Sequence, residues 1–257
     1  MARILIAGLA KSGTTGLWSK LKNSFGWKYK AYFEGDYTGQ KKKNMICKLL
    51  IGPEFDVALC DEFDKVIWIV RDPRDRLVSY YLYRIYDYRY DDDEFLAGYV
   101  PLLQKKEREP DAVTLVELEQ LLFLPTPTMQ SAFFWNDASI PKKLGFVLKY
   151  EDFIDGNLEP LEEYLERRLS GNADVPQRLS RVVRTRSYGF WKDWFTETDV
   201  ATYRPLFREF MELYGYSDDW NTHTEKKIDA ATCSGYALRI INDRRSQVGL
   251  PTFSAEG

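Results

Sequence analysis

Short apolar runs and stretches of helical spacing alternate along much of the chain. Residues 66–70 (Val-Ile-Trp-Ile-Val) are apolar at every position, as in a central parallel strand that is covered on both faces. The predicted strands are residues 4–7, 27–33, 45–51, 66–70 and 146–150. The predicted helices are residues 14–25, 53–63, 73–86, 113–122, 128–135, 158–169 and 200–213. Strands that alternate with helices predict a three-layer α/β/α fold with a mainly parallel central sheet.

Two segments interrupt this pattern. Residues 89–112 contain an acidic run at 91–94 and a charged stretch at 105–110. This composition suggests either a mobile insertion that acts as a lid or an exposed loop without a role. Residues 222–257 are polar, and the pattern assigns no element to this tail. The length of 257 residues suits one large domain or two small ones, and we expect residues 1–257 to form a single domain.

The composition argues against several classes of protein. The net charge of −3 gives no general attraction to nucleic acid or acidic lipid, so any site for a polyanion must be a local basic patch. Three cysteines without paired spacing and a single histidine, His223, indicate neither a disulfide framework nor a metal site. No apolar run approaches the roughly 20 residues of a membrane span. We therefore expect a cytoplasmic protein without a membrane span, a metal or a nucleic-acid partner.

The first predicted strand leads into a loop whose residues suit a phosphate. Glycines let the backbone approach an anion, a helix N-terminus favours negative charge, and lysine and hydroxyl side chains add donors. The loop differs from the common P-loop, because Thr14 stands where that pattern has its lysine and the lysine comes earlier. A tight turn with an exposed lysine is the plainer alternative. The residues expected to hold a phosphate are Lys11, Ser12, Gly13, Thr14 and Thr15.

A second candidate anion site follows the strand at 66–70. Arg71 lies at the end of that strand, and Ser79 lies eight residues later, two turns along the predicted helix. Arg71 could equally pair with a neighbouring aspartate such as Asp72 or Asp75. Two separate phosphate sites would suit an adenosine that carries both a 5′ and a 3′ phosphate.

Four segments in order resemble the sulfotransferases that use 3′-phosphoadenosine 5′-phosphosulfate. Residues 11–15 resemble their 5′-phosphosulfate loop, and residues 71–81 resemble their 3′-phosphate motif. Residues 149–153 resemble the strand of that family that ends in Tyr-Glu-Asp, and residues 189–196 resemble its Gly-x-Trp-Lys segment. The resemblance covers roughly residues 3–200 and implies a P-loop NTPase-like fold. It also implies transfer of a sulfonate group to a hydroxyl or amine of an acceptor, with the phosphosulfate as co-substrate and no metal.

The resemblance also implies roles for single residues. Lys11 would neutralise the leaving 5′-phosphate, and Lys48 would touch the transferred sulfonate unless it is a plain surface lysine of its strand. Arg184 matches the arginine that reaches the 3′-phosphate alongside Arg71 and Ser79.

The chain departs from the family at several positions. In the C-terminal segment, Thr185 replaces a lysine and Arg186 a glycine, which implies a weaker or differently shaped loop. Gly16 replaces the tryptophan that stacks on adenine in cytosolic members, so either the adenine is held differently or another aromatic stacks on it, with Trp18 and Trp191 as candidates. Leu50 stands where those members have a histidine, so the general base is a carboxylate or the remote histidine. We favour Glu34 as the base, with Asp36 and His223 as alternatives.

Two other functions remain open. A small-molecule kinase would suit the strand–loop–helix start, although the lysine is displaced and no clear Mg²⁺ carboxylate motif follows. A non-catalytic nucleotide-binding protein of the same fold would explain the missing histidine. The acceptor is expected to be a small molecule or a glycan, and the oligomeric state is left open.

Overall fold

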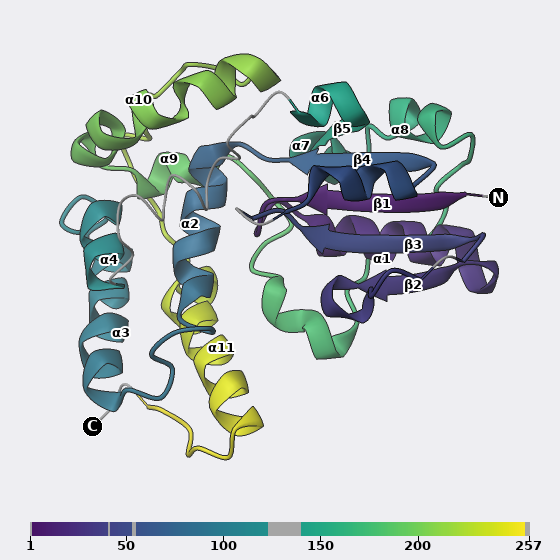
Figure 1. The fold of residues 1–257 in the computed structure, drawn as a ribbon. Coiled ribbons are helices and arrows are strands. Elements are labelled where there is room, and N and C mark those ends of the chain that lie inside the picture. Colours follow the sequence, from purple (N-terminus) through teal and green to yellow (C-terminus); the bar gives the residue numbers. More distant parts are fainter. Residues whose placement is uncertain (1, 41, 53–54, 123–139, 255–257) are drawn as a thin grey trace. The chain divides into compact units, whose positions relative to one another are not determined.

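The computed structural model describes residues 2–40, 42–52, 55–122 and 140–254 (Figure 1). The chain divides into two compact units. The first unit comprises the described parts of Met1–Asp72 and Gln130–Ser180, and the second those of Pro73–Met129 and Arg181–Gly257. Each unit is described below by itself, and the prediction of a single domain stays a prediction.

The first unit is built on a five-stranded sheet in which every neighbouring pair of strands is parallel. The strand order is β2-β3-β1-β4-β5, which places β1 at the centre and β2 at one edge (Figure 1). The strands are β1 (Arg3–Gly8), β2 (Lys30–Phe33), β3 (Met45–Leu50), β4 (Lys65–Val70) and β5 (Phe146–Lys149). The predicted α/β class and parallel central sheet are confirmed.

Both faces of the sheet are covered, which explains the continuous apolar runs. Ile4 and Ile6 of β1 pack on one face with helices α1 (Thr14–Phe25) and α8 (Glu159–Tyr164). Leu5 and Ala7 point to the other face, where the 3₁₀ helix η3 (Val57–Glu62) contributes to the core. Successive side chains of a strand point to opposite faces of the sheet. When both faces are covered, both sets of side chains are buried, which favours apolar residues at every position.

The second unit has only helical elements among its described residues. They are α2 (Pro73–Arg84), α3 (Asp93–Arg108), α4 (Leu115–Leu121), α9 (Trp191–Trp194), α10 (Glu197–Tyr214), the 3₁₀ helix η5 (Ala230–Thr232) and α11 (Ser234–Gln247). Aromatic rings dominate part of its core: Phe195 packs on Tyr203 and Trp220, with ring centroids 5.9 and 6.0 Å apart.

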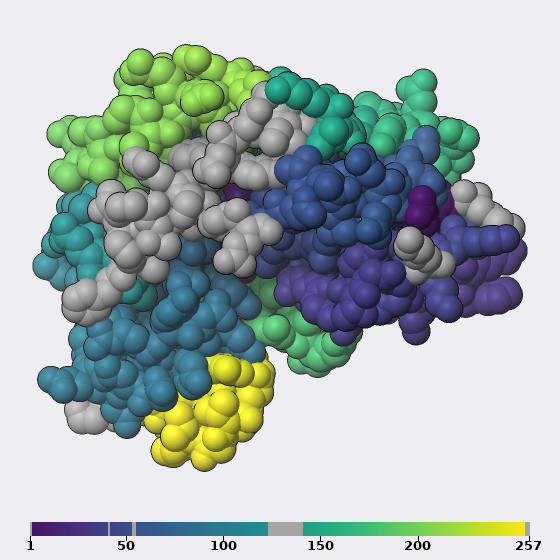
Figure 2. Space-filling view, viewed as in Figure 1, coloured from purple at the N-terminus to yellow at the C-terminus, as the bar shows by residue number. Residues whose placement is uncertain are grey.

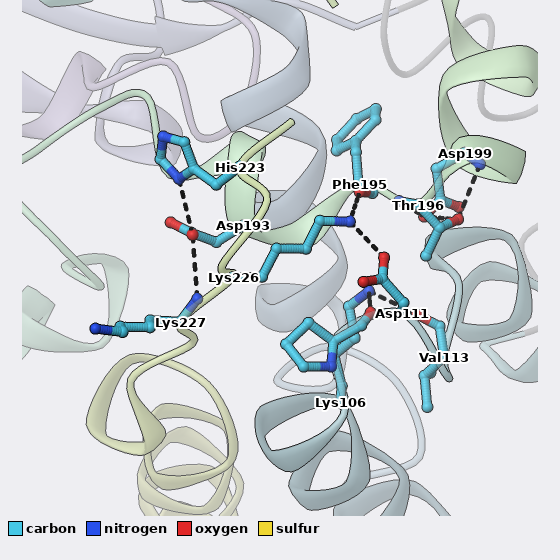
Figure 3. Close-up of polar contacts among 11 residues, drawn as sticks. Lys106, Asp111, Val113, Asp193, Phe195, Thr196, Asp199, His223, Lys226 and Lys227 are labelled. Atoms are coloured by element: carbon cyan, nitrogen blue, oxygen red, sulfur yellow. Dashed lines mark hydrogen bonds and ion pairs between the residues drawn. The ribbon is translucent and has the colours of Figure 1, made fainter. Parts of the chain in front are cut away.

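Buried charged side chains tie the loops of this unit together (Figure 3). The Asp199 carboxylate is fully buried and accepts hydrogen bonds from the backbone N–H groups of Leu115 and Thr196, at 2.8 and 2.9 Å. One carboxylate therefore satisfies donors at the starts of both α4 and α10. Lys106, also fully buried, donates to the carbonyl of Val113 at 2.6 Å, and Lys226 donates to that of Phe195 at 2.7 Å. Burial lowers the pKa of Lys106 to about 8.

Several predicted boundaries are wrong. The strand predicted at 27–33 begins only at Lys30, because Gly26–Lys28 forms the 3₁₀ helix η1. The helix predicted at 53–63 is the 3₁₀ helix η3, and the one predicted at 158–169 ends at Tyr164 as α8. Tyr150 opens helix α7 (Tyr150–Asp155) instead of ending β5. The first unit also contains helix α6 (Ile140–Leu144) and the 3₁₀ helices η2 (Glu34–Asp36) and η4 (Gln177–Val182). The last residues of η4 belong to the second unit.

Two segments that the sequence did not assign form regular helices. Most of 89–112 forms the 16-residue helix α3, so the alternative of an exposed irregular loop is wrong. The mobility of this segment stays a prediction. The tail at 222–257 contains α11. The helix predicted at 128–135 lies outside the described residues. Within the described part of the chain, no helix is both long and apolar enough to cross a membrane.

Segments that are distant in sequence share the surface of the first unit. In the space-filling view, the purple and dark blue residues of β1 to β4 adjoin the teal and green residues that follow position 140 (Figure 2). This arrangement follows from the sheet order, because β5 is added beside β4 although about 75 residues separate them in the chain.

Candidate functional site

The loop between β1 and α1 has a backbone that few residues could adopt. Gly13, the N-cap of α1, has φ +92°, and Lys11 has φ +70°. A Cβ built on Gly13 would lie 2.5 Å from Cδ2 of Tyr150, closer than any real contact. Gly13 is thus required both by its left-handed conformation and by the ring packed against it.

The start of α1 is arranged to receive an anion. Gly13 has no side chain with which to cap the helix, and the first turn contains no acidic residue. Thr14 and Thr15 open the helix directly after Gly13, and Ser12 is held by a hydrogen bond from its N–H to the Leu9 carbonyl at 3.1 Å. Backbone N–H groups at the start of a helix of this length, together with the helix dipole, attract negative charge. The structure therefore supports a phosphate or sulfate group at this end of the loop.

Arg71 is fixed beside the same loop. Its Nη1 donates to the Lys11 carbonyl at 3.1 Å, and its guanidinium lies 4.2 Å from the centre of the Tyr150 ring. The neighbouring Asp72 N–H donates to Oε1 of Glu151 at 3.0 Å. The first two residues of the Tyr-Glu-Asp segment thus join the loop to the end of β4. This positioning role is one that the sequence reasoning missed, although it had picked out the segment itself.

Lys48 and Glu34 form an ion pair between neighbouring strands. Lys48 is 2% exposed in the middle of β3, paired in register with Phe33, and its ammonium lies 4.3 Å from the Phe33 ring centre. Glu34 follows β2 directly with φ +46°, and its side chain is 39% exposed. The alternative that Lys48 is a plain surface lysine is wrong, because its ammonium is buried against Glu34, and its contact with a sulfonate stays a prediction. The pair presents a half-exposed carboxylate oriented by a buried cation.

Ser79 and Arg184 lie together in the second unit. Arg184 Nε donates to Oγ of Ser79 at 3.3 Å, and the guanidinium lies 3.9 Å from the Phe190 ring centre. Two residues from separate motifs, 105 positions apart, thus meet. Asp75, fully buried, accepts the N–H groups of Gly189 and Trp191 at 2.5 and 2.9 Å. Asp75 was not singled out as a site residue, and its role is to bind the Gly-x-Trp-Lys segment to α2.

The two adenine-stacking candidates are both buried. Trp18 is 2% exposed, and its indole N–H donates to the Tyr32 carbonyl at 3.0 Å, so it is a core residue and the prediction for it is wrong. Trp191 is also 2% exposed, with the Arg74 guanidinium 4.0 Å from its ring centre. A base could stack on that face of Trp191 only if Arg74 moved, and its role stays a prediction.

His223, one of the alternative bases, is held by a carboxylate (Figure 3). Its Nδ1 lies 2.9 Å from Oδ1 of Asp193, which also accepts the Lys227 N–H at 3.1 Å. The His223 side chain is 53% exposed. A carboxylate at Nδ1 fixes the tautomer and leaves Nε2 able to accept a proton. Asp36 is the second residue after Glu34 in η2 and is exposed.

Among the described residues, no group of three or more histidine, cysteine, aspartate or glutamate side chains is arranged to hold a metal ion.

Comparison with known proteins gives a structural likeness without a sequence match. No family model and no curated protein matches the chain. The crystal structure of mouse sulfotransferase SULT7A1 complexed with PAP superposes with a TM-score of 0.53 at 16% identity, covering 83% of this chain and 88% of that one. A looser match, with a TM-score of 0.45 and 14% identity over 81% of this chain and 80% of the other, is retinol dehydratase in complex with androsterone and inactive cofactor PAP. The chain therefore has the fold of the sulfotransferases, as the four sequence segments predicted.

Proposed function

We propose that this protein is a sulfotransferase that transfers a sulfonate group from 3′-phosphoadenosine 5′-phosphosulfate to a hydroxyl or amine of an acceptor. The observation that carries the proposal is the β1–α1 loop, in which Lys11 and Gly13 adopt left-handed conformations at an N-terminus that lacks a side-chain cap. The sulfotransferase fold of the chain supports the same function.

The donor would be bound at its two phosphate ends. In this proposal, Lys11 and the loop residues Ser12, Gly13, Thr14 and Thr15 bind the 5′-phosphosulfate. Arg71, Ser79 and Arg184 bind the 3′-phosphate. The contact between Ser79 and Arg184 supports this assignment, because a hydroxyl and a guanidinium side by side provide the donors that a phosphate accepts.

The transfer step needs charge stabilisation and a base. An acceptor oxygen or nitrogen attacks sulfur, the bond from sulfur to the bridging oxygen of the 5′-phosphate breaks, and the acceptor loses its proton. Lys11 would stabilise the negative charge on the departing phosphate. Lys48 would orient the Glu34 carboxylate, whose second oxygen makes no hydrogen bond within the described part of the chain, to take the proton. The products are the sulfated acceptor and adenosine 3′,5′-bisphosphate.

The test is transfer of labelled sulfonate from the donor to a panel of phenols, alcohols, amines and glycans. Transfer by the full chain supports the proposal. Lys11→Ala should lower the rate by about 100-fold or more, in the range found when one charge-stabilising donor is removed. Lys105→Ala, which removes an exposed lysine of α3, should leave the rate unchanged. Absence of transfer to every acceptor, with tight and selective binding of adenosine 3′,5′-bisphosphate, would support the non-catalytic alternative.

Three variants distinguish the candidate bases. Glu34→Gln should abolish most of the transfer activity, because an amide cannot take the proton. Asp36→Asn should change little, since this exposed carboxylate differs from Glu34 in having no buried lysine beside it. If His223→Gln is the variant that loses activity, the dyad of His223 and Asp193 is the base and the assignment of Glu34 is wrong.

The kinase alternative makes an opposite prediction. A kinase would bind ATP with Mg²⁺ in preference to adenosine 3′,5′-bisphosphate and would transfer a phosphoryl group. Competition between the two nucleotides in one binding assay separates these functions.

A further inference from the structure

A fully exposed tryptophan lies at the end of α1, away from the candidate site. Trp27 is 91% exposed, whereas the other exposed large apolar side chains lie between 37% and 53%. The 3₁₀ turn η1 holds it in this position. The rings of Phe25 and Tyr29 on either side pack against each other with centroids 4.6 Å apart, and Phe25 belongs to the core. The turn is therefore anchored while Trp27 projects into solvent.

Five lysines share the amino edge of the sheet with Trp27. Lys30 opens β2 and its N–H donates to the Asn44 carbonyl at 3.2 Å, so the start of β2 adjoins the start of β3. α1 must end at this edge, because the chain continues from it into β2. We call the following set the Trp27 surface: Trp27, Lys22, Lys28, Lys30, Lys42 and Lys43.

The lysines of the Trp27 surface are not paired with any described acidic side chain. All five lysines are exposed, and none forms an ion pair within the described part of the chain. Residues 22–33 and 42–50 contain no aspartate or glutamate. The whole chain carries a net charge of −3, so this is a local concentration of positive charge on an acidic protein.

The residue types indicate what kind of anion the surface suits. Specific recognition of a phosphate or sulfate group uses the planar fork of arginine, which makes two parallel hydrogen bonds. The five lysines of the Trp27 surface give diffuse attraction to a charged plane. The neighbouring Arg167 is instead engaged with the protein, because its guanidinium lies 4.7 Å from the Phe25 ring centre and donates to the Ser24 carbonyl at 3.4 Å. An exposed tryptophan, apolar in its rings and polar at its N–H, is favoured at the boundary between lipid chains and headgroups.

We propose that the Trp27 surface docks the protein on an anionic lipid bilayer, with Trp27 inserted among the headgroups and the lysines facing the anionic lipids. The loop of Lys11 in the same unit is left free in this orientation. The loop of Lys11 follows the carboxyl end of β1, while the Trp27 surface is at the amino ends of β2 and β3 in the same parallel sheet. Strands of this length separate the two edges by roughly 15–20 Å.

The test is sedimentation of the full chain with vesicles of phosphatidylcholine and phosphatidylserine, compared with vesicles of phosphatidylcholine alone. We expect binding to the anionic vesicles, weakened by salt. Lys28→Gln/Lys30→Gln should lower the partition coefficient by about 30-fold, since each surface lysine contributes roughly a factor of five. The matched control Lys105→Gln/Lys227→Gln removes the same charge from exposed positions elsewhere and should leave partitioning nearly unchanged.

Quenching by brominated phospholipids tests the insertion of Trp27 directly. Of the tryptophans in the described part of the chain, Trp27 is the exposed one, so in a Trp135→Phe background Trp27→Phe should abolish the quenching without a change in the unfolding midpoint. Equal loss of binding in the control pair would overturn the proposal, as would quenching that persists in Trp27→Phe. Binding to heparin with no binding to anionic vesicles would also overturn it and would assign the surface to a polyanionic chain.

Discussion

Replacing Gly13 by alanine tests the packing of Tyr150 against the loop between β1 and α1. Two effects add at this position. The φ of +92° is left-handed, which costs a residue with a Cβ roughly 1–2 kcal/mol. The new Cβ would also lie 2.5 Å from the Tyr150 ring, and overpacking of this kind costs about 1–3 kcal/mol. We therefore expect Gly13→Ala to lower the free energy of unfolding by about 2–5 kcal/mol.

Gly156→Ala provides the matched control. Gly156 has the same left-handed backbone as Gly13, with φ +82° and ψ +13°, but a Cβ built on it meets no atom within 4 Å. It should therefore cost only the conformational term, about 1–2 kcal/mol. Alanine reduces the entropy of the unfolded chain equally in both variants, so this contribution cancels from the difference.

Urea unfolding followed by circular dichroism measures both variants. The difference between them isolates the collision with Tyr150, which we expect to be at least about 1 kcal/mol. Tyr150→Leu in the Gly13→Ala background should recover part of that difference, because the ring that meets the Cβ is gone. Equal destabilisation by Gly13→Ala and Gly156→Ala would refute the packing of Tyr150 against the loop.

Two further predictions concern groups buried outside the loop. Burial raises the pKa of the Cys47 thiol from about 9 to about 12, so the folded protein keeps a proton that the unfolded chain loses above pH 9. The contribution of the protonated Cys47 thiol to the free energy of unfolding is therefore fully present below pH 9 and is lost as the pH rises towards 12. The free energy of unfolding, measured with urea, should therefore fall between pH 7 and pH 10 by about 1 kcal/mol less in Cys47→Ala than in the unaltered protein. An equal fall in both proteins would contradict the burial of Cys47. Asp199→Asn should lower the free energy of unfolding by about 2–4 kcal/mol. The N–H groups of Leu115 and Thr196 bond to the two different oxygens of the Asp199 carboxylate, whereas an amide has only one acceptor oxygen. Asp218→Asn, at a carboxylate that is 66% exposed, should change the free energy of unfolding very little, and a similar loss in both variants would contradict the capping role of Asp199.

The sheet and the loop were predictable from the sequence because their constraints are local. β1 and β4 are buried on both faces, and every position in their runs had to be apolar. The spacing of Lys11 and Gly13 after β1 marked the loop. The meeting of Ser79 and Arg184 was expected only through the family resemblance, since nothing local in either segment indicates a partner 105 residues away.

The errors have physical explanations. Residues 27–33 alternate aromatics as a strand does, but the contact of Phe25 with Tyr29 stabilises a turn in the first part of that stretch. The charges of 89–112 suggested a loop. In the structure, however, Asp92 caps α3, and the acidic residues of its first turn and the basic residues of its last turn both stabilise the helix through its dipole. These charges therefore define a helix and its ends.

Other parts of the site depend on tertiary contacts. Tyr150 gains its role by packing between Arg71 and Gly13, which lie in two other segments of the chain. Asp75 gains its role by accepting N–H groups from the Gly-x-Trp-Lys segment. Neither contact leaves a periodicity or spacing that a sequence pattern could reveal.

Binding of adenosine 3′,5′-bisphosphate, measured by calorimetry, tests the central claim most directly. The account predicts saturable binding that is stronger than that of ATP and depends on the 3′-phosphate. Lys11→Ala should weaken it by about 10- to 100-fold, the loss of one charge-assisted hydrogen bond, while Lys105→Ala leaves it unchanged. Equal affinity in the Lys11→Ala variant, or preference for ATP, would contradict the claim that the loop of Lys11 and Gly13 binds the 5′ end of a phosphosulfate donor.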